Sequence, residues 1–409
     1  MYKLLPFIIA SLIFIPQART EEKPIQIKPY GYISYEILYD TYRSMDTRDG
    51  ELYLFPKKPQ YDIYGNDINK RSKFNMLSVH SRFGINISGP DALGARTSGR
   101  MEADFFGTHQ NYVRMVRMRQ AFIRLNWENT ELLMGNTFHP TFVLDCFPLT
   151  VSFAAAVPFH PLNRSPQLRV THNFSTDFSA SLSFLVHGYH YSAGPSDAQR
   201  NSGLPESVIQ LRWGNSRDIM LGVTGGYKFL SPRDITNNGM ATSKTVGAYH
   251  LQGFTKWVTS PVTIKAEAMY GENMSHFVMI GGYGAKGTPQ TIDWEGDYDY
   301  ANLRTLSLWT DIHSNHEIWQ WGLFAGYTEN LGSKDLYTPI AGLSRYDDLH
   351  YLLRVSPRIT YFTNNLSFGL EYSYYNAVYA ENFDEYRRPS ASMDAAINSH
   401  IVFQAKYDF

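Results

Sequence analysis

Charged side chains recur at alternate positions in segments whose other positions are apolar. Seven of these side chains are acidic: Glu36, Asp40, Glu102, Asp104, Glu267, Glu371 and Asp408. Ten are basic, and eight of the ten are arginine: Arg82, Arg96, Arg100, Arg119, Arg169, Arg212, Lys265, Arg354, Arg358 and Lys406. A guanidinium group presents a planar fork of N–H donors that matches a carboxylate or a phosphate. The set therefore predicts recognition of anions, with the acidic members as candidate partners of the arginines, because buried charges are normally paired.

Nucleophilic catalysis has a weaker basis in the sequence. His187 and His190 lie near Ser192, and His172 lies near Ser175, but no spacing recurs as a catalytic triad would require. With thirteen histidines in the chain, such neighbours are expected by chance. A nucleophile and its base are partners in space, so a hydrolase stays an alternative that sequence cannot remove.

An acidic group near the start of the chain could hold a cation. Asp40, Asp46, Asp49 and Glu51 offer the oxygen ligands that Ca²⁺ prefers. Their spacing is not that of an EF-hand, so a solvated loop is the stronger interpretation and calcium the weaker one. We expect no catalytic residue, no bound metal and no cofactor.

The elements that must position the charged residues are β-strands. Apolar and polar residues alternate with a period of two in 75–88, 262–271, 366–375 and 400–409. This period indicates strands with one apolar face and one polar face. The segment 113–126 is the least regular, because Arg117 and Arg119 share the parity of apolar residues that follow them.

Sixteen strands can be traced from one end of the chain to the other. Seven tight turns and eight longer connections alternate strictly between them, as antiparallel pairing in one closed sheet requires. The predicted strands are 29–42, 72–88, 94–106, 113–126, 131–137, 166–174, 180–190, 206–213, 218–229, 244–257, 262–274, 298–311, 317–329, 347–361, 366–379 and 397–409.

This pattern predicts an all-β fold, a 16-stranded antiparallel transmembrane β-barrel of porin-like form. Outer-membrane barrels have an even number of strands, short periplasmic turns and long external loops. A soluble propeller or sandwich is the structural alternative. The turns of such a soluble protein would not alternate between short and long. Its outer face would carry charged residues, whereas the apolar face of the strands predicted here carries almost none. The last strand also ends in an aromatic residue, Phe409.

Composition agrees with a barrel and excludes other classes. The 409 residues are 43% hydrophobic and 15% aromatic, with one cysteine and a net charge of -1. A single cysteine excludes a disulfide scaffold, and the neutral balance argues against nucleic acid as a partner. Aromatic girdles at both lipid interfaces explain the aromatic content. The candidates at strand ends are Tyr30, Tyr32, Tyr39, Trp213, Tyr227, Trp257, Tyr270, Trp319, Trp321, Tyr351, Tyr361, Tyr407 and Phe409.

The N-terminus is predicted to be an export signal. Lys3 precedes a short apolar run that ends near Pro16, which is typical of a secretory signal peptide and too short for a spanning helix. A retained anchor is the alternative. The expected organisation is a signal peptide over 1–20, a short periplasmic segment over 21–28 and a single barrel domain over 29–409.

The third long loop, 138–165, differs from the others. It holds four prolines and many apolar residues around Cys146, so it is stiff and poorly suited to free exposure in water. We expect it to fold into the barrel and narrow the lumen, since long loops are often functional. Packing on a neighbouring subunit is the alternative.

Several short motifs in 74–170 together resemble one family, the DcaP-like outer-membrane porins. They are Ser81-Arg82-Phe83-Gly84, Glu102-x-Asp104-Phe105-Phe106-Gly107, Met118-Arg119-Gln120-Ala121-Phe122, Gly135-Asn136-Thr137, Leu144-Asp145 and Arg164-Ser165-Pro166-Gln167-Leu168-Arg169. The resemblance implies a trimeric barrel that passes small, mostly anionic solutes such as carboxylates. It also implies that Arg82, Arg119, Arg164 and Arg169 line the narrow part, with Glu102 and Asp104 as counter-charges. The N-terminal coiled coil of many family members is not matched in 21–28.

The sequence therefore predicts an outer-membrane porin for passive diffusion of small hydrophilic solutes, favouring anions through an arginine-rich constriction. A plugged binding or adhesin barrel is the alternative in another class, with the hydrolase behind it. The expected partners are outer-membrane lipids, small anionic or polar solutes and two further copies of the chain. The predicted pore-lining residues are Arg82, Arg100, Glu102, Asp104, Arg119, Asp145, Arg164, Arg169, Arg212, Arg354 and Arg358.

Overall fold

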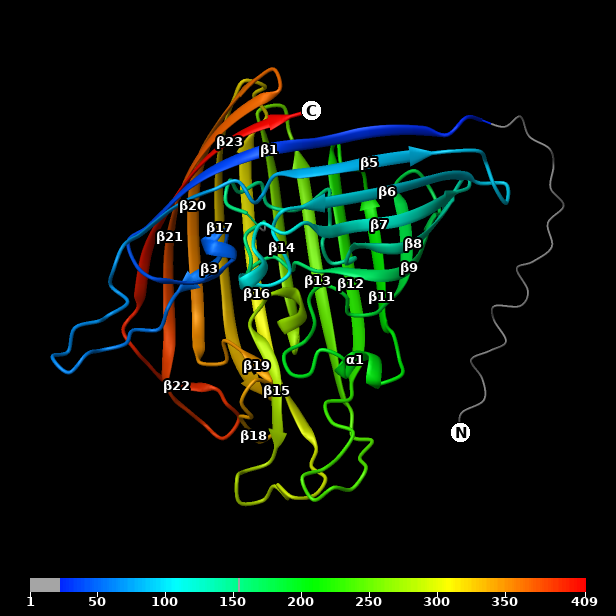
Figure 1. Cartoon of the computed structure of the whole chain (residues 1–409). Helices are drawn as coiled ribbons and strands as arrows, with labels where there is room; N and C mark the ends of the chain where they lie inside the picture. The colour runs from blue at the N-terminus through cyan, green and yellow to red at the C-terminus, as the bar shows by residue number, and fades with distance from the viewer. Residues whose placement is uncertain (1–22, 154) are drawn as a thin grey trace.

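One antiparallel sheet winds around the molecule and closes on itself (Figure 1). The computed structural model describes residues 23–153 and 155–409, so the predicted signal peptide over 1–20 lies outside the described residues. Closure joins the first strand, β1 (Gln26–Asp40), to the last, β23 (Ala396–Asp408), in a register that runs from Tyr32 opposite Asp408 to Asp40 opposite His400. The predicted 16-stranded antiparallel barrel is confirmed.

The second barrel strand is built from two pieces, β4 (Lys73–Leu77) and β5 (Arg82–Ser88), separated by a turn at 78–81. Both pieces pair with β1. The remaining barrel strands are β6 (Arg96–Asp104), β7 (Arg117–Asn126), β8 (Thr130–Phe138), β9 (Arg164–Asn173), β10 (Phe178–Leu185), β11 (Glu206–Gly214), β12 (Ile219–Leu230), β13 (Val246–Val258), β14 (Val262–Glu272), β16 (Tyr300–Ser314), β17 (Trp319–Ser333), β20 (Leu349–Thr363) and β21 (Leu366–Phe383).

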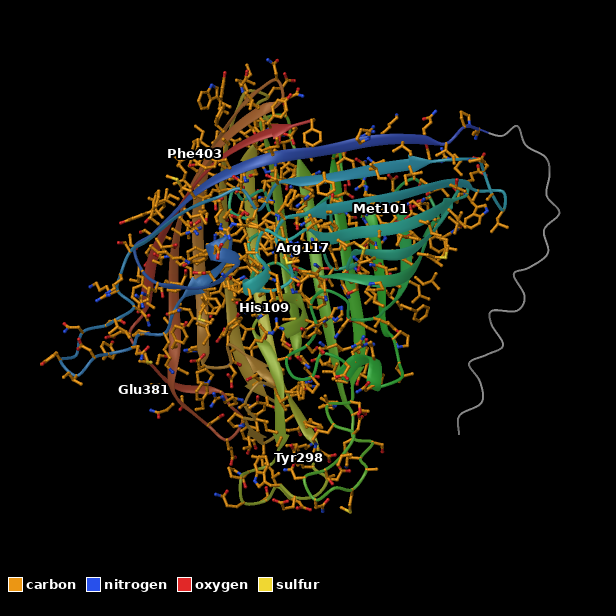
Figure 2. The ribbon with its side chains drawn as sticks, viewed as in Figure 1. Met101, His109, Arg117, Tyr298, Glu381 and Phe403 are labelled. Carbon is orange, nitrogen blue, oxygen red and sulfur yellow. The ribbon has the colours of Figure 1, made fainter. Side chains whose placement is uncertain are left out.

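Short turns and long loops alternate around the barrel as predicted. The tight turns include 127–129, 259–261 and 364–365, and they lie at the same end of the barrel as the C-terminus (Figure 1). The long loops gather at the opposite end, where Figure 2 marks Tyr298. They carry the minor elements β2 (Ser44–Thr47), η1 (Arg48–Gly50), β3 (Leu52–Pro56), η2 (Gln110–Tyr112), α1 (Ala198–Asn201), η3 (Met274–Phe277), β15 (Gly281–Lys286), β18 (Tyr337–Thr338), β19 (Ser344–Arg345) and β22 (Pro389–Ser392). No helix in the described part of the chain is long and apolar enough to cross a membrane.

Alternate residues of the strands form an apolar outer surface. Exposed side chains on it include Ile209 on β11, Val223 on β12 and Leu251 on β13. Most of the predicted girdle aromatics are outward, such as Trp257 and Trp319, which are both about half exposed. An apolar belt bounded by aromatic residues suits a bilayer.

Two of the predicted girdle residues face the other way. Tyr30 donates a hydrogen bond to the Glu102 carboxylate over 3.1 Å, and the Tyr32 ring lies under the Arg82 guanidinium. Both therefore point into the barrel, and their assignment to the girdle was wrong. They share the parity of Glu36 and Asp40 on the same strand, both of which are buried.

The irregular alternation in the fourth strand has a structural cause. The pairing of β6 with β7 shifts by one residue between Glu102–Gln120 and Ala103–Met118, so Arg119 sits in a β-bulge. Arg117 and Arg119 consequently point inward on one side of the bulge, while Ile123 on the other side is exposed to the outside. A bulge adds one residue to one strand and so reverses the parity beyond it.

Two loops fold into the barrel instead of staying outside. One is L3, defined here as residues 139–163, which contributes Phe142, Val143 and Phe159 to a large buried apolar cluster. The other is the β2–β3 hairpin of the first loop, whose Tyr53 stacks on His400 of β23 with ring centroids 4.4 Å apart. The inward hairpin was not anticipated from the sequence.

A charge placed on the outer belt tests this orientation. Replacing Val223, near the middle of β12, with arginine should destabilise the folded barrel by about 2–4 kcal/mol, because a lipid-facing guanidinium is costly at the bilayer midplane. Ile219→Arg, at the end of the same strand, is the matched control and should cost about 1 kcal/mol or less. Urea unfolding in lipid vesicles measures both. Equal effects at the two positions would contradict the assigned depth.

Candidate functional site: the arginines of the barrel interior

An ion-pair ladder lines the inner face of β6 and β7. Arg117 binds the Asp104 carboxylate with both branches of its fork, through Nε over 2.6 Å and Nη2 over 3.0 Å. Arg119 bridges two acids, with Nε 2.7 Å from Glu102 and Nη1 2.9 Å from Asp104. All four side chains are buried. Two cations and two anions therefore neutralise each other here, as expected for buried charges.

Two further arginines border this ladder and leave it with excess positive charge. Arg82 reaches Glu102 only at 3.9 Å and lies over the Tyr32 ring. Arg164 is buried and packs its guanidinium over the rings of Phe138 and Tyr189. Arg164 makes no salt bridge among the residues that the structure describes.

The arginines nearer the tight-turn end face polar cavities. Arg169 donates to the Gln167 side chain and to the Phe138 carbonyl, and it has no carboxylate partner in the described part of the chain. It borders a polar cavity of about 380 Å³, lined also by Arg96, Glu131 and Arg212. A second cavity, of about 260 Å³, is lined by the polar residues Lys28, Asn86, Ser88, Ser98, Arg100 and Arg124 together with Ile87, Gly99 and Phe122.

Arg212 connects the first of these cavities to L3. Its Nη2 lies 2.5 Å from the carboxylate of Asp145, and both side chains are partly exposed. The predicted loop residue Asp145 therefore does lie at the wall beside a predicted arginine. Arg100 instead donates to Asn86 over 2.8 Å and lies over the Tyr30 ring.

Arg354 and Arg358 occupy a different place from the other predicted residues. Arg354 binds Glu371 at 2.7 Å and also donates to Ser152 of L3. Arg358 binds Asp311 at 2.8 Å. Both arginines are buried. Their charges are thus compensated on the wall where L3 rests, away from Arg169.

L3 is held across the barrel by polar contacts with several strands. Val151 N–H donates to Glu371 of β21, and Ser307 of β16 donates to the Phe159 carbonyl. Gln252 of β13 donates to the Thr141 carbonyl. These contacts confirm that the third loop is folded into the lumen.

The single cysteine belongs to this buried loop. The Cys146 thiol is fully buried and donates to the Thr255 carbonyl over 3.0 Å. Burial raises the pKa of the thiol to about 12. The group stays protonated at neutral pH and is chemically quiet, since the thiolate is the reactive form.

Several interior residues were missed by the sequence reasoning or only partly seen. Arg117 was not proposed as a pore-lining residue, because it shares the parity of apolar residues that follow it in the sequence. The β-bulge at Arg119 reverses that parity and turns Arg117 inward. Tyr189 was not proposed at all, yet its hydroxyl bonds both Arg117 and the Gly107 carbonyl. No local pattern marks Tyr189, because it comes from a loop that meets the ladder only in the folded barrel.

The structure gives no support to the two alternatives raised from the sequence, a hydrolase and a calcium site. No hydrogen bond joins His187 or His190 to Ser192 within the described ranges. Asp46 pairs with Lys73 at 2.8 Å and Asp49 pairs with Arg114 at 3.0 Å. Cations of the chain therefore already neutralise two of the acids that were considered for calcium.

A closed barrel of sixteen strands, with an apolar belt outside and a loop folded inside, defines a bacterial outer-membrane protein of porin-like fold. No protein-family model matches the chain. No curated protein matches it either.

Solved structures share this fold at low sequence identity. The outer-membrane channel DcaP of Acinetobacter baumannii is 14% identical, with a TM-score of 0.66 over 94% of this chain and 98% of the channel. The anion-selective porin from Comamonas acidovorans is 8% identical, with a TM-score of 0.59 over 94% and 100%. OmpT of Vibrio cholerae is 9% identical, with a TM-score of 0.57 over 95% and 99%. The resemblance to DcaP-like porins is thus confirmed at the level of the fold.

Proposed function

We propose that this barrel is a porin for passive diffusion of small hydrophilic solutes and that it favours anions such as carboxylates. The observation that carries the proposal is the set of partly exposed arginines without a close carboxylate partner, Arg82, Arg100 and Arg169. Rings of basic side chains select anions in pores. No catalytic step and no cofactor are part of this function.

The predicted pore-lining residues divide into two roles within the proposal. Arg82, Arg100, Arg169 and Arg212 face the solute in this proposal, because all four are partly exposed and the last three border cavities of the lumen. The others hold the wall and L3 in place, because they are buried in ion pairs or against aromatic rings. These are Glu102, Asp104, Arg119, Arg164, Arg354 and Arg358. Asp145 ties L3 to Arg212 at the boundary between the two groups.

The similar structures support the direction of this selectivity. The Comamonas acidovorans porin is itself described as anion-selective, and the Acinetobacter baumannii protein as a channel. A homotrimer in the outer-membrane lipid is part of the same proposal. One Vibrio cholerae OmpT structure is described as a trimer form. Size in detergent by light scattering tests the trimer, and a monomeric mass would contradict it.

Single-channel recording in planar bilayers tests the function. We expect stepwise conductance with a reversal potential, in a salt gradient, that reports preference for chloride over potassium. A cation-selective reversal potential would refute the anion preference but would still agree with a diffusion channel. An intact barrel that conducts no current would refute the channel itself.

The second candidate is a plugged binding or adhesin barrel. The observation in its favour is that L3 and the β2–β3 hairpin both fold inward and bury large side chains such as Phe55 and Phe159. The same recording separates the two functions, because a plugged barrel would stay closed under the voltages that open a porin.

A further inference from the structure

The loop between β3 and β4 forms a hairpin, called here the L1 hairpin and defined as residues 57–72. Figure 1 shows it extending sideways beyond the barrel wall, near the end that carries the long loops. Ile68 N–H donates to the Gln60 carbonyl over 2.8 Å. At the turn, the Asp62 carboxylate accepts from the backbone N–H of Asn66 over 2.9 Å. Hydrogen bonds within the loop therefore fix the shape of its tip.

The tip of the L1 hairpin presents apolar and aromatic side chains that are largely exposed. Ile63 is 90% exposed and Tyr64 is 83% exposed. Tyr61, beside them, is exposed too. A group of large exposed side chains on a hairpin of fixed shape is typical of a contact surface. Tyrosine has an apolar body and a polar tip, which suits the boundary between hydrocarbon and water.

The L1 hairpin leaves the wall at the edge of the lipid-facing belt. Tyr39 of β1 lies opposite Phe74 of β4, and both are exposed on the outer surface. Phe74 directly follows Lys73, the first residue of β4. The belt therefore reaches the base of the hairpin, and the sideways direction of the hairpin carries its tip over the lipid and not over the lumen (Figure 1).

The segment 57–73 also carries an excess of positive charge. It holds five cations and two acids, Asp62 and Asp67, which leaves an excess of three positive charges in a chain whose net charge is -1. The acids are held within the loop, since Asp67 accepts from Gln60 N–H over 3.1 Å. The five cations are Lys57, Lys58, Lys70, Arg71 and Lys73. Basic side chains at a membrane surface are attracted to anionic lipids.

A polar cleft of about 360 Å³ lies at the base of the L1 hairpin. It is lined by Arg43, Ser44, Asp46, Lys57, Ser72 and Lys73. Lys73 is bound to Asp46 at 2.8 Å. Arg43 and Lys57 form no ion pair among the residues that the structure describes. Two available cations and two hydroxyl groups suit a phosphate, which takes charge-assisted hydrogen bonds from such groups.

We propose that the L1 hairpin docks on the outer leaflet of the membrane. Ile63 and Tyr64 enter the interface, and the cleft of Arg43 and Lys57 binds the phosphate of an anionic lipid. Aromatic and apolar side chains combined with basic ones are typical of segments that lie on a membrane surface. A second copy of this nearly neutral chain would have to offer an acidic patch to match the hairpin. The contact goes beyond the channel function and does not depend on it.

A nitroxide label at the tip tests the docking in the full chain. Cys146 is fully buried, so the cysteine of an Ile63→Cys variant is the one open to the label. In vesicles of equimolar phosphatidylcholine and phosphatidylglycerol, we expect this label to collide with dissolved oxygen more than with a water-soluble nickel chelate. Ile235→Cys is the matched control, because Ile235 is an exposed isoleucine of the loop after β12. Its label should prefer the nickel chelate.

Removing charge from the cleft tests the lipid phosphate. Arg43→Gln with Lys57→Gln, added to Ile63→Cys, should move the equilibrium of the tip between lipid and water roughly tenfold toward water, because each cation near an anionic surface contributes severalfold. Vesicles of phosphatidylcholine alone should cause a similar shift in the chain that keeps both cations. Arg200→Gln with Lys286→Gln removes two exposed cations of other segments and should change nothing.

Three results would overturn the proposal. A label at Ile63 that prefers the nickel chelate would place the tip in water. A label shielded from both reagents would place the tip against a second copy of the chain. An unchanged preference for oxygen, both in the Arg43 and Lys57 variant and without phosphatidylglycerol, would show that no anionic lipid is bound.

Discussion

Replacing Asp104 with asparagine should destabilise the barrel by about 3–5 kcal/mol, the usual cost of breaking a buried ion pair from one side. Asp104 is fully buried and accepts from both Arg117 and Arg119. Without the charge of Asp104, Arg117 loses the anion that it binds through two nitrogens, and Arg119 loses one of the two anions that it bridges. Both guanidinium groups are buried, so water cannot readily replace the lost anion. Unfolding in urea with lipid vesicles, followed by tryptophan fluorescence, measures the loss.

Two variants decide whether charge causes this loss. Asp91→Asn breaks an exposed pair with Lys23, and such pairs contribute at most about 1 kcal/mol. Asp104→Asn combined with Arg117→Gln removes the uncompensated cation as well, so it should be less destabilising than the sum of the two single changes. A double variant that merely adds the single effects would show that Asp104 matters through its packing and not through its charge.

Neutralising Arg82 and Arg169 together, as Arg82→Gln with Arg169→Gln, should lower the anion preference of the channel roughly fivefold at low salt. A unit charge about 8 Å from a solute contributes about 0.5 kcal/mol in water, so two contribute about 1 kcal/mol. The two side chains are partly exposed and form no short carboxylate contact among the described residues. Reversal potentials in a salt gradient measure the change.

Salt and a surface control make this second result specific. The effect should largely vanish at 1 M salt, where the Debye length falls to about 3 Å. Arg71→Gln with Arg217→Gln removes the same charge from exposed positions outside the lumen and should leave selectivity unchanged. An unaltered reversal potential in the Arg82 and Arg169 variant would remove both residues from the solute path.

The selectivity prediction depends on a distinction that sequence does not contain. Alternation placed Arg169 and Arg354 on the same polar face of the strands, and both do point inward. Only the folded chain shows that Arg354 is compensated by Glu371 beneath L3, whereas Arg169 has amide and carbonyl partners. Ion pairs form between strands and loops that are far apart in the chain, so local spacing cannot separate paired from unpaired charge.

The fold itself was largely accessible from the sequence. A period of two, combined with turns sorted by length, determines a barrel, because each strand must bury one face in lipid and every backbone group must be paired. The strand count and the order of loops followed from this reasoning, and the inward third loop followed from its prolines and apolar residues. The parity argument placed Arg119 on the inner face, where it lies, but left Arg117 unassigned, because a single bulge residue reverses the faces of β7.

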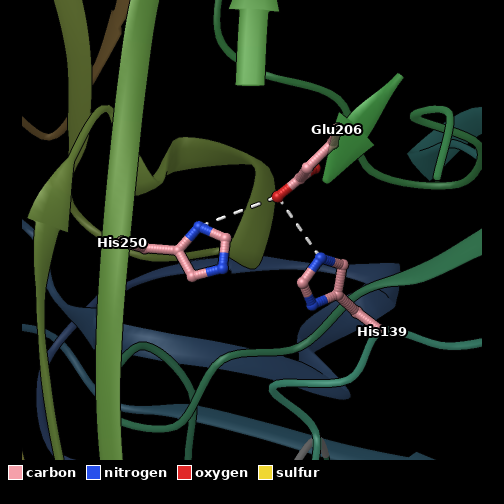
Figure 3. Close-up of side chains that lie close together, drawn as sticks. All are labelled: His139, Glu206 and His250. Atoms are coloured by element: carbon pink, nitrogen blue, oxygen red, sulfur yellow. Dashed lines mark ion pairs between the residues drawn. The ribbon is translucent and has the colours of Figure 1, made fainter. Parts of the chain in front are cut away.

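The sequence by itself thus determined the architecture, the membrane-facing surface and the identity of the charged inner face. The tertiary structure alone decided which arginines lack a close carboxylate partner and how the β2–β3 hairpin packs in the interior. It also decided that four histidines surround Glu206, two of which Figure 3 shows: His139, His187, His250 and His276. The physical reason is the range of the interactions. Alternation is a property of neighbouring residues, whereas charge compensation depends on side chains from distant strands and loops that barrel closure brings together.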